Sequence, residues 1–139
     1  MSCFLCDAVT AGVGEDSLVL ELTEHSMVIM NRYPYINGHL MVVPKTHVSG
    51  LHELATAEFE DLHRTLSKCV DRVGQTVNPH GMNLGMNLGK AAGAGVDDHI
   101  HYHVIPRFLG DNNAFNVLGE VRVIPEDLLS AYRRYRPAF

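Results

Sequence analysis

Long hydrophobic runs are absent from this sequence. No stretch approaches the roughly 18 uninterrupted apolar residues that a membrane-spanning helix needs. The first residues also lack the basic region followed by an apolar region that marks a secretory signal, so we expect a cytoplasmic protein with no membrane partner. Cysteine is scarce as well: three residues, an odd number without an export signal, do not indicate a disulfide framework.

Positive charge is in deficit. The chain has 11 lysines and arginines against 16 aspartates and glutamates, a formal net charge of −5. A general nucleic-acid binder is normally basic, so we expect no nucleic-acid partner, and a ligand that carries phosphate must be met by local cations. No internal repeat, low-complexity stretch or linker divides the 139 residues, which is typical of a single domain over residues 1–139.

The patterns that are present predict both strands and helices. Apolar runs bounded by turn residues predict strands over 17–22, 26–30, 39–43, 82–88 and 120–124. Apolar residues at helical spacing predict a helix over about 56–74 with Thr56 as its cap, and Pro125 with the acids behind it opens a last helix over about 125–136. Together these elements indicate an α+β domain with a mainly antiparallel sheet.

Nine histidines are the anomaly of the composition, and three of them alternate in the run His99–Ile105. Because alternate side chains of a strand share one face, a strand over about 98–106 would place His99, His101 and His103 side by side, roughly 6–7 Å apart. Three explanations are open: partly exposed structural histidines, a metal chelate, or nucleophilic catalysis by a neutral imidazole. Three imidazoles on one face favour nucleophilic catalysis.

The alternating run resembles the signature of the histidine triad (HIT) superfamily of nucleotide hydrolases and transferases. Other segments agree with this resemblance: residues 31–34, 38–47 and 87–93, Pro106-Arg107 after the triad, and residues 110–112 and 119–126. The last segments are similar to the bacterial branch of diadenosine tetraphosphate phosphorylases and hydrolases. The resemblance implies a HIT-like fold with a five-stranded, mainly antiparallel sheet and two helices, and a homodimer.

By the same resemblance His101 is the nucleophile on the α-phosphate, His103 contacts a phosphate or leaving oxygen, and His39 assists. Further residues implied in substrate binding are Asn31 at the ribose and, on the phosphate side, Asn87, Gly93, Gly95, His103 and Arg107. The expected substrate is a dinucleoside polyphosphate similar to diadenosine tetraphosphate, with AMP as a product. Water or phosphate accepts the nucleotidyl group, and the residues do not decide which.

One departure from the family bears on the substrate. Many members carry Gln-Ser or Gln-Thr shortly before the triad, whereas this chain has Ala94-Gly95-Val96-Asp97-Asp98. Without that hydroxyl, hydrolysis of adenosine 5'-phosphoramidate is disfavoured relative to polyphosphate cleavage, which has a better leaving group. Three alternatives to a polyphosphate-cleaving enzyme are open: an adenosine 5'-phosphoramidate hydrolase, a nucleotide-binding regulator without turnover, and an interaction module built on zinc.

The N-terminal segment over residues 1–10 contains Cys3-Phe4-Leu5-Cys6, which has the spacing of half a zinc site. Two ordinary reduced thiols are the alternative. The resemblance to bacterial triad proteins supplies two further ligands, His47 and His99. A closed site of four ligands, Cys3, Cys6, His47 and His99, would hold a structural zinc ion and leave His101 free for chemistry.

Overall fold

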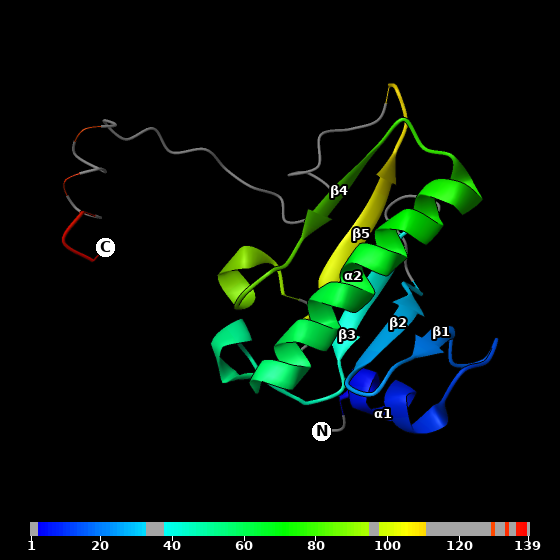
Figure 1. Cartoon of the computed structure of the whole chain (residues 1–139), viewed down its shortest axis with the longest axis horizontal. Helices are drawn as coiled ribbons and strands as arrows, with labels where there is room; N and C mark the ends of the chain where they lie inside the picture. The colour runs from blue at the N-terminus through cyan, green and yellow to red at the C-terminus, as the bar shows by residue number, and fades with distance from the viewer. Residues whose placement is uncertain are drawn as a thin grey trace.

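A five-stranded antiparallel sheet organises the chain (Figure 1). This computed structural model describes residues 3–32, 38–94 and 98–110, together with 129, 133 and 136–138. The strands are β1 (Val19–Leu22), β2 (Ser26–Met30), β3 (Leu40–Pro44), β4 (Gly81–Gly85) and β5 (Tyr102–Arg107), in the order β1-β2-β3-β5-β4. Every neighbouring pair is antiparallel, which confirms the expected fold class.

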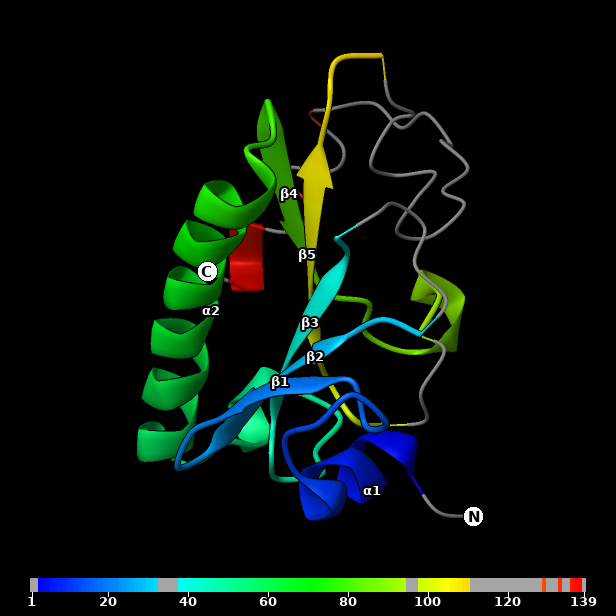
Figure 2. The same ribbon diagram turned by 90° about the vertical axis from the view of Figure 1, so that its right-hand side faces the viewer.

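Two α-helices lie on opposite sides of the sheet (Figure 2). They are α1 (Phe4–Ala11) and α2 (Thr56–Val77), and short 3₁₀ turns form η1 (Leu51–Glu53), η2 (Lys90–Ala92) and η3 (Arg136–Ala138). Neither α-helix is long and apolar enough to cross a membrane. Helix α2 covers one face with the buried cluster Val28, Val42, Leu62, Leu66, Cys69, Val73 and Val104.

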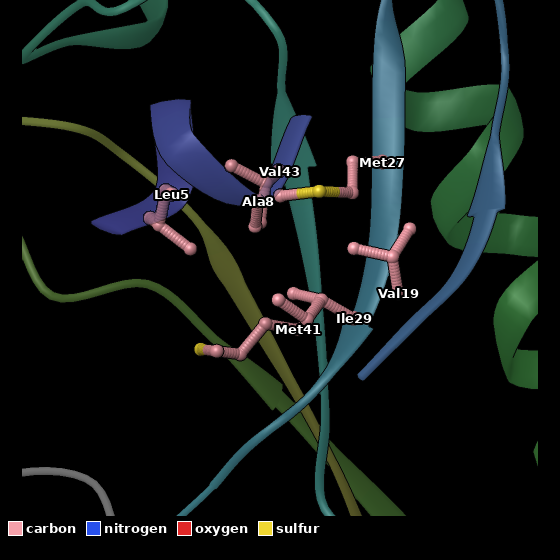
Figure 3. Close-up of a cluster of buried hydrophobic side chains, with 7 residues drawn as sticks. All are labelled: Leu5, Ala8, Val19, Met27, Ile29, Met41 and Val43. Atoms are coloured by element: carbon pink, nitrogen blue, oxygen red, sulfur yellow. The ribbon is translucent and has the colours of Figure 1, made fainter. Parts of the chain in front are cut away.

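The opposite face carries a second apolar cluster, formed by residues of the sheet and of α1 (Figure 3). It consists of Leu5, Ala8, Val19, Met27, Ile29, Met41 and Val43. On β3, Val42 belongs to the α2 cluster while Met41 and Val43 belong to this one, as the two-residue period of a strand requires. Met41 is paired with His103 in the sheet, so His103 lies on the same side as α1.

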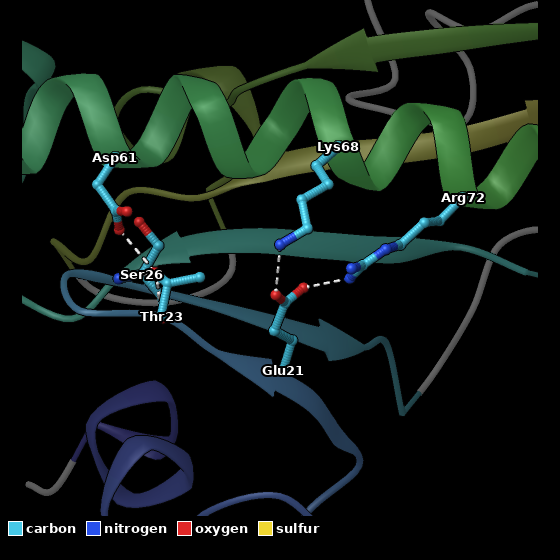
Figure 4. Close-up of polar contacts among 6 residues, drawn as sticks. All are labelled: Glu21, Thr23, Ser26, Asp61, Lys68 and Arg72. Carbon is cyan, nitrogen blue, oxygen red and sulfur yellow. Dashed lines mark hydrogen bonds and ion pairs between the residues drawn. The ribbon is translucent and has the colours of Figure 1, made fainter.

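Helix α2 is fastened to the first two strands by polar contacts as well as by packing (Figure 4). The Asp61 carboxylate accepts hydrogen bonds from the Thr23 hydroxyl at 2.6 Å and from the His25 backbone N–H at 3.1 Å. Glu21 on β1 pairs with Lys68 at 2.9 Å and with Arg72 at 2.6 Å. These contacts join the helix to the β1–β2 hairpin.

The helix boundaries differ from those expected. Helix α1 was not predicted, and it gains its stability from Leu5 and Ala8, which are buried against the sheet. Thr56 is the first residue of α2 and not its cap, since Ala55 holds that position and its N–H donates to Glu58 at 3.0 Å. The helix continues past Gly74 to Val77 and ends where Asn78 adopts a left-handed conformation.

The triad strand also begins later than expected. The predicted range was 98–106, but β5 starts at Tyr102 because β3 ends at Pro44, which has no N–H to continue the ladder. His99 and Ile100 instead bond to the Pro44 and Val48 carbonyls. The expected strand 82–88 is the shorter β4, while the predicted strand 120–124 and most of the predicted helix 125–136 lie outside the described residues.

Candidate active site

Three buried histidines form a row on the face of the sheet opposite α2. His101 directly precedes β5, His103 lies within it, and His39 directly precedes β3. The ring centroids of His101 and His103 are 4.9 Å apart, and those of His103 and His39 are also 4.9 Å apart. The expected association of His39 with the triad is therefore present, and it arises because β3 and β5 are neighbours in the sheet.

The tautomer of His101 is fixed by the backbone. Its Nδ1 lies 3.0 Å from the carbonyl oxygen of His99, and a carbonyl can only accept a hydrogen bond. Nδ1 therefore carries the proton, and the lone pair is on Nε2. A neutral imidazole with one nitrogen held and the other unprotonated is the form needed for nucleophilic attack.

A hydrogen-bonded chain orients His103. His39 Nε2 lies 2.8 Å from His103 Nδ1, and the amide nitrogen of Asn31 lies 3.5 Å from His39 Nδ1. With the amide as donor, His39 Nδ1 accepts and its Nε2–H donates to His103 Nδ1. That leaves the proton of His103 on Nε2, where it can be donated to an oxygen of a ligand.

Burial keeps these rings neutral. Burial, with His101 nearby, lowers the pKa of His39 to about 4. Burial, with His101 and His39 beside it, lowers the pKa of His103 to about 3. Burial also lowers the pKa of His101, although the hydrogen bond to the His99 carbonyl opposes the shift. All three are therefore uncharged at neutral pH, as an imidazole nucleophile and its neutral donors must be.

A cavity of about 300 Å³ adjoins His101. It is lined by Ser49, Asn87, Gly89, Lys90, Ala94, Asp98, His99, Ile100 and His101. His101 is only 5% exposed, yet it borders this open space and is not enclosed by apolar side chains. A second cavity, of about 380 Å³, lies between α2 and the sheet, and among the described residues no histidine lines it. The first cavity is therefore the candidate substrate site.

The residues expected on the phosphate side are only partly gathered around this cavity. Asn87 lines it, and its amide nitrogen donates to the Gly93 carbonyl at 3.4 Å. Arg107 lies at the far end of β5, where its guanidinium donates to Asn83 at 2.8 Å. Gly95 lies outside the described residues. The geometry thus places Asn87 on the same cavity as His101 and ties Arg107 to the adjacent strand.

The four predicted metal ligands converge at the start of α1. The sulfur atoms of Cys3 and Cys6 and the ring nitrogens of His47 and His99 all lie within 4.8 Å of one another. Nδ1 of His99 is 3.4 Å from Cys3 Sγ and 3.5 Å from Cys6 Sγ, and Nδ1 of His47 is 3.4 Å from Cys6 Sγ. Tetrahedral zinc spaces such ligand atoms about 3.3–3.8 Å apart, so the donor set fits a metal ion.

The orientation of His99 is suited to that role. Its Nε2 lies 2.7 Å from the Pro44 carbonyl oxygen and must donate to it, which leaves the lone pair on Nδ1 facing the sulfurs. A backbone carbonyl that fixes the tautomer of a ligating histidine is a common second layer of metal sites. The first triad histidine therefore faces the two cysteines, and like His101 it lies before the start of β5.

Two residues on the rim of the cavity, Ser49 and Asp98, were not identified from the sequence. Ser49 follows His47 in the loop after β3, and Asp98 directly precedes His99 with a positive φ of 55°. No motif marks either residue. Asp98 was visible in the sequence only as part of the segment that departs from the family pattern.

Comparison with known proteins agrees with this geometry. The profile of the family described as the HIT domain matches residues 13–110. A Mycobacterium tuberculosis protein named AP-4-A phosphorylase is 40% identical over 120 residues, which are 86% of this chain and 61% of that protein. The chain thus spans about three fifths of the length of that relative. The match covers well over half of the chain, and the protein belongs to the HIT domain family.

Two further similarities extend the comparison. Adenosine 5'-monophosphoramidase hnt1 of Schizosaccharomyces pombe is 31% identical over 107 residues, covering 77% of this chain and 75% of that protein. A crystal structure of a HIT family protein from Bacillus anthracis superposes with a TM-score of 0.77 at 22% identity, covering 99% of this chain and 94% of that one. The structural match establishes the fold.

Proposed function

We propose that the protein is a nucleotidyl hydrolase or transferase that cleaves dinucleoside polyphosphates at the α-phosphate through a nucleotidyl-His101 intermediate. The observation that carries the proposal is the hydrogen bond from His101 Nδ1–H to the His99 carbonyl, which leaves Nε2 unprotonated beside the cavity. The name of the M. tuberculosis relative supports the substrate class, and the relative is similar over 86% of this chain.

The first step forms one bond and breaks another. The lone pair of His101 Nε2 attacks the α-phosphorus, and the bond from that phosphorus to the bridging oxygen breaks. With diadenosine tetraphosphate the leaving group is ATP, and the AMP moiety stays on His101. His103 Nε2–H, oriented by His39, donates a hydrogen bond to the oxygen on which charge develops. Positioned donors of this kind supply most of the catalysis in phosphoryl-type transfer.

The second step returns the electron pair to His101. An oxygen of the acceptor attacks phosphorus and the P–N bond breaks, so that water yields AMP and a proton, while inorganic phosphate yields ADP. In this proposal Asn31 binds the ribose, and Asn87 and Gly95 bind the phosphate chain. The resemblance also implied Gly93 and Arg107, but the Gly93 N–H donates to the Lys90 carbonyl and Arg107 donates to Asn83 at the far end of β5. The support is that Asn31 adjoins His39 and that Asn87 lines the cavity.

The second candidate is hydrolysis of adenosine 5'-phosphoramidate. The S. pombe relative with that name, at 31% identity, favours it. The absence of a serine or threonine between Ala94 and His99 counts against it, because a phosphoramidate leaving group needs a proton donor. A nucleotide-binding regulator without turnover would use the same pocket and form no covalent adduct.

The test compares wild type with His101→Ala and with the control His80→Ala, an exposed histidine whose ring accepts a hydrogen bond from the Leu109 N–H, beyond the end of β5 that is opposite the triad. Diadenosine tetraphosphate and adenosine phosphoramidate are offered separately, with and without phosphate, and adducts are sought by intact-protein mass spectrometry. We expect ATP release by wild type and His80→Ala and a loss of about 1,000-fold or more in His101→Ala, with AMP binding retained. Equal activity in His101→Ala would refute covalent catalysis, and AMP binding without turnover of either substrate by wild type would favour the regulator.

Zinc is the metal that this proposal assigns to Cys3, Cys6, His47 and His99. Two thiolates and two imidazoles are a typical structural set, which pins the N-terminal segment beside His99. Reduced thiolate ligands suit the cytoplasm, where we place the protein. Elemental analysis of protein never exposed to chelator should find about one equivalent. Cys6→Ser should lose it and Cys69→Ala should keep it, whereas metal-free wild type would exclude the site.

A homodimer completes the proposal. Strand β4 is at the edge of the sheet, where an unpaired strand offers its backbone to a second copy, and Leu84 on β4 is 46% exposed. Analytical ultracentrifugation should find a dimer for wild type and a shift to monomer for Leu84→Glu. The control is Leu109→Glu, at a leucine that is 86% exposed and outside the strands. A monomeric wild type would refute the assignment.

A further inference from the structure

The two ends of the candidate active site differ in charge. The row from His101 through His103 to His39 consists of neutral rings. The cavity on the other side of His101 has two charged residues among the described ones that line it, Lys90 on η2 and Asp98 directly before His99. Both are exposed. An anion that approaches His101 through this cavity therefore meets one positive and one negative side chain.

The loop beside the cavity offers few backbone donors for an anion. The N–H groups of Ala92 and Ala94 donate to the Gly89 carbonyl at 3.2 Å, and that of Gly93 donates to the Lys90 carbonyl at 3.0 Å. The resemblance to the family placed Gly93 of this loop on the phosphate side, but these three N–H groups already donate to carbonyl oxygens within the loop. The Lys90 ammonium, by contrast, makes no ion pair or hydrogen bond with any described residue.

The acceptor must enter where the leaving group departs. In an in-line displacement the incoming oxygen attacks phosphorus on the side opposite the bond to His101, which is the position that the leaving nucleotide has vacated. Inorganic phosphate arrives as an anion and water arrives uncharged. Charged side chains on the rim therefore change the rate of attack by phosphate and leave the rate of attack by water nearly unaffected.

We propose that the cavity beside His101 is the acceptor site, and that Lys90 and Asp98 set the ratio of phosphorolysis to hydrolysis by attracting and repelling inorganic phosphate. The inference rests on the proposed function. It adds the residues that determine whether water or inorganic phosphate is the acceptor, which the proposed function leaves undecided. Asp98 has a φ of 55°, which asparagine tolerates as well as aspartate, so Asp98→Asn removes the charge without straining the backbone.

The experiment measures how the nucleotidyl enzyme partitions between its two acceptors. Diadenosine tetraphosphate is supplied with graded inorganic phosphate; ATP counts all turnovers, ADP counts phosphorolysis and AMP counts hydrolysis. The ratio of ADP to AMP arises after the leaving group has departed, so changes in substrate affinity do not affect it. At phosphate below saturation, Lys90→Met should lower this ratio about fivefold and Asp98→Asn should raise it about as much.

Lys68→Met is the matched control. It removes the same charge from the protein, lies on α2 on the opposite side of the sheet, and leaves Glu21 paired with Arg72. Its ratio should equal that of wild type. A wild type that releases ATP but forms no ADP at any phosphate concentration refutes the acceptor site alone. So do variants whose ratios stay unchanged. A wild type that releases no ATP refutes the proposed function itself.

Discussion

His39 should act on catalysis entirely through His103. Its Nε2–H is the donor that leaves His103 with its own proton on Nε2, across a buried contact of 2.8 Å. In His39→Ala the donor is gone, and His103 is free to adopt the tautomer that has no proton to donate to the substrate. A lost buried hydrogen bond costs about 1–3 kcal/mol, which corresponds to a fall in kcat of about 5- to 150-fold.

The assay separates this effect from a contact with substrate. KM should change little because His39 does not need to touch the nucleotide, and His39→Gln should recover part of the activity because its amide can donate to His103. His52→Ala, an exposed histidine on η1, should behave as wild type. A variant with unchanged kcat and a raised KM would refute the positioning role of His39.

The pH profile gives an independent readout. His103 has a pKa of about 3 and His39 of about 4, so neither ring gains a proton above about pH 5 in wild type. Burial is the largest cause for His103, and His39 is among the neighbours that lower its pKa further. Without His39 the pKa of His103 rises, and the acid limb of kcat should move to higher pH. An acid limb at the same pH in both proteins would contradict this account.

Three further predictions concern stability, measured by urea unfolding. Leu62 lies on the buried face of α2 and is fully buried, so Leu62→Ala should cost about 2–5 kcal/mol, while Val13→Ala, at a valine 63% exposed, should cost less than about 0.5 kcal/mol. His39 and His103 have a lower pKa in the folded than in the unfolded chain, so the unfolded state binds more protons and stability should fall as pH drops from about 6.5 toward 4; His39→Ala should show a shallower fall. Burial raises the pKa of Asp61, but the hydrogen bonds that its carboxylate accepts from Thr23 and His25 outweigh burial and lower the pKa overall. Wild type should therefore lose stability below about pH 4, and Asp61→Asn should lack that contribution at every pH.

The alternation of apolar residues predicted the sheet well because burial on one face leaves a direct trace in sequence. Strands β1, β2 and β3 begin or end within two residues of the predicted ranges. The start of β5 could not be predicted in the same way, because it depends on the missing N–H of Pro44, a residue of the neighbouring strand. Helix α1 was missed because eight residues carry little periodicity, and packing of Leu5 and Ala8 decides their conformation.

The same distinction applies to the candidate site: its local residue pattern could be predicted from the sequence, and its long-range contacts could not. The residue types needed for nucleophilic attack were visible in one short run, but the association of His39 with His103 spans 64 positions and that of Cys3 with His99 spans 96. Spacing alone cannot predict contacts so distant, and only the resemblance to a family supplied them. The tautomers of His99 and His101 follow from carbonyl groups whose directions exist only in the folded chain.

The partner that fixes the tautomer of His101 is a main-chain oxygen, and this has an evolutionary consequence. No point mutation at position 99 deletes a carbonyl, so a substitution there removes an imidazole from the Cys3, Cys6, His47 and His99 cluster while the hydrogen bond that fixes the tautomer of His101 is kept. Descendants of such a protein are free to exchange the N-terminal thiols for other means of stabilisation. The path of the chain, more than the identity of any one side chain, is what selection must preserve at this point.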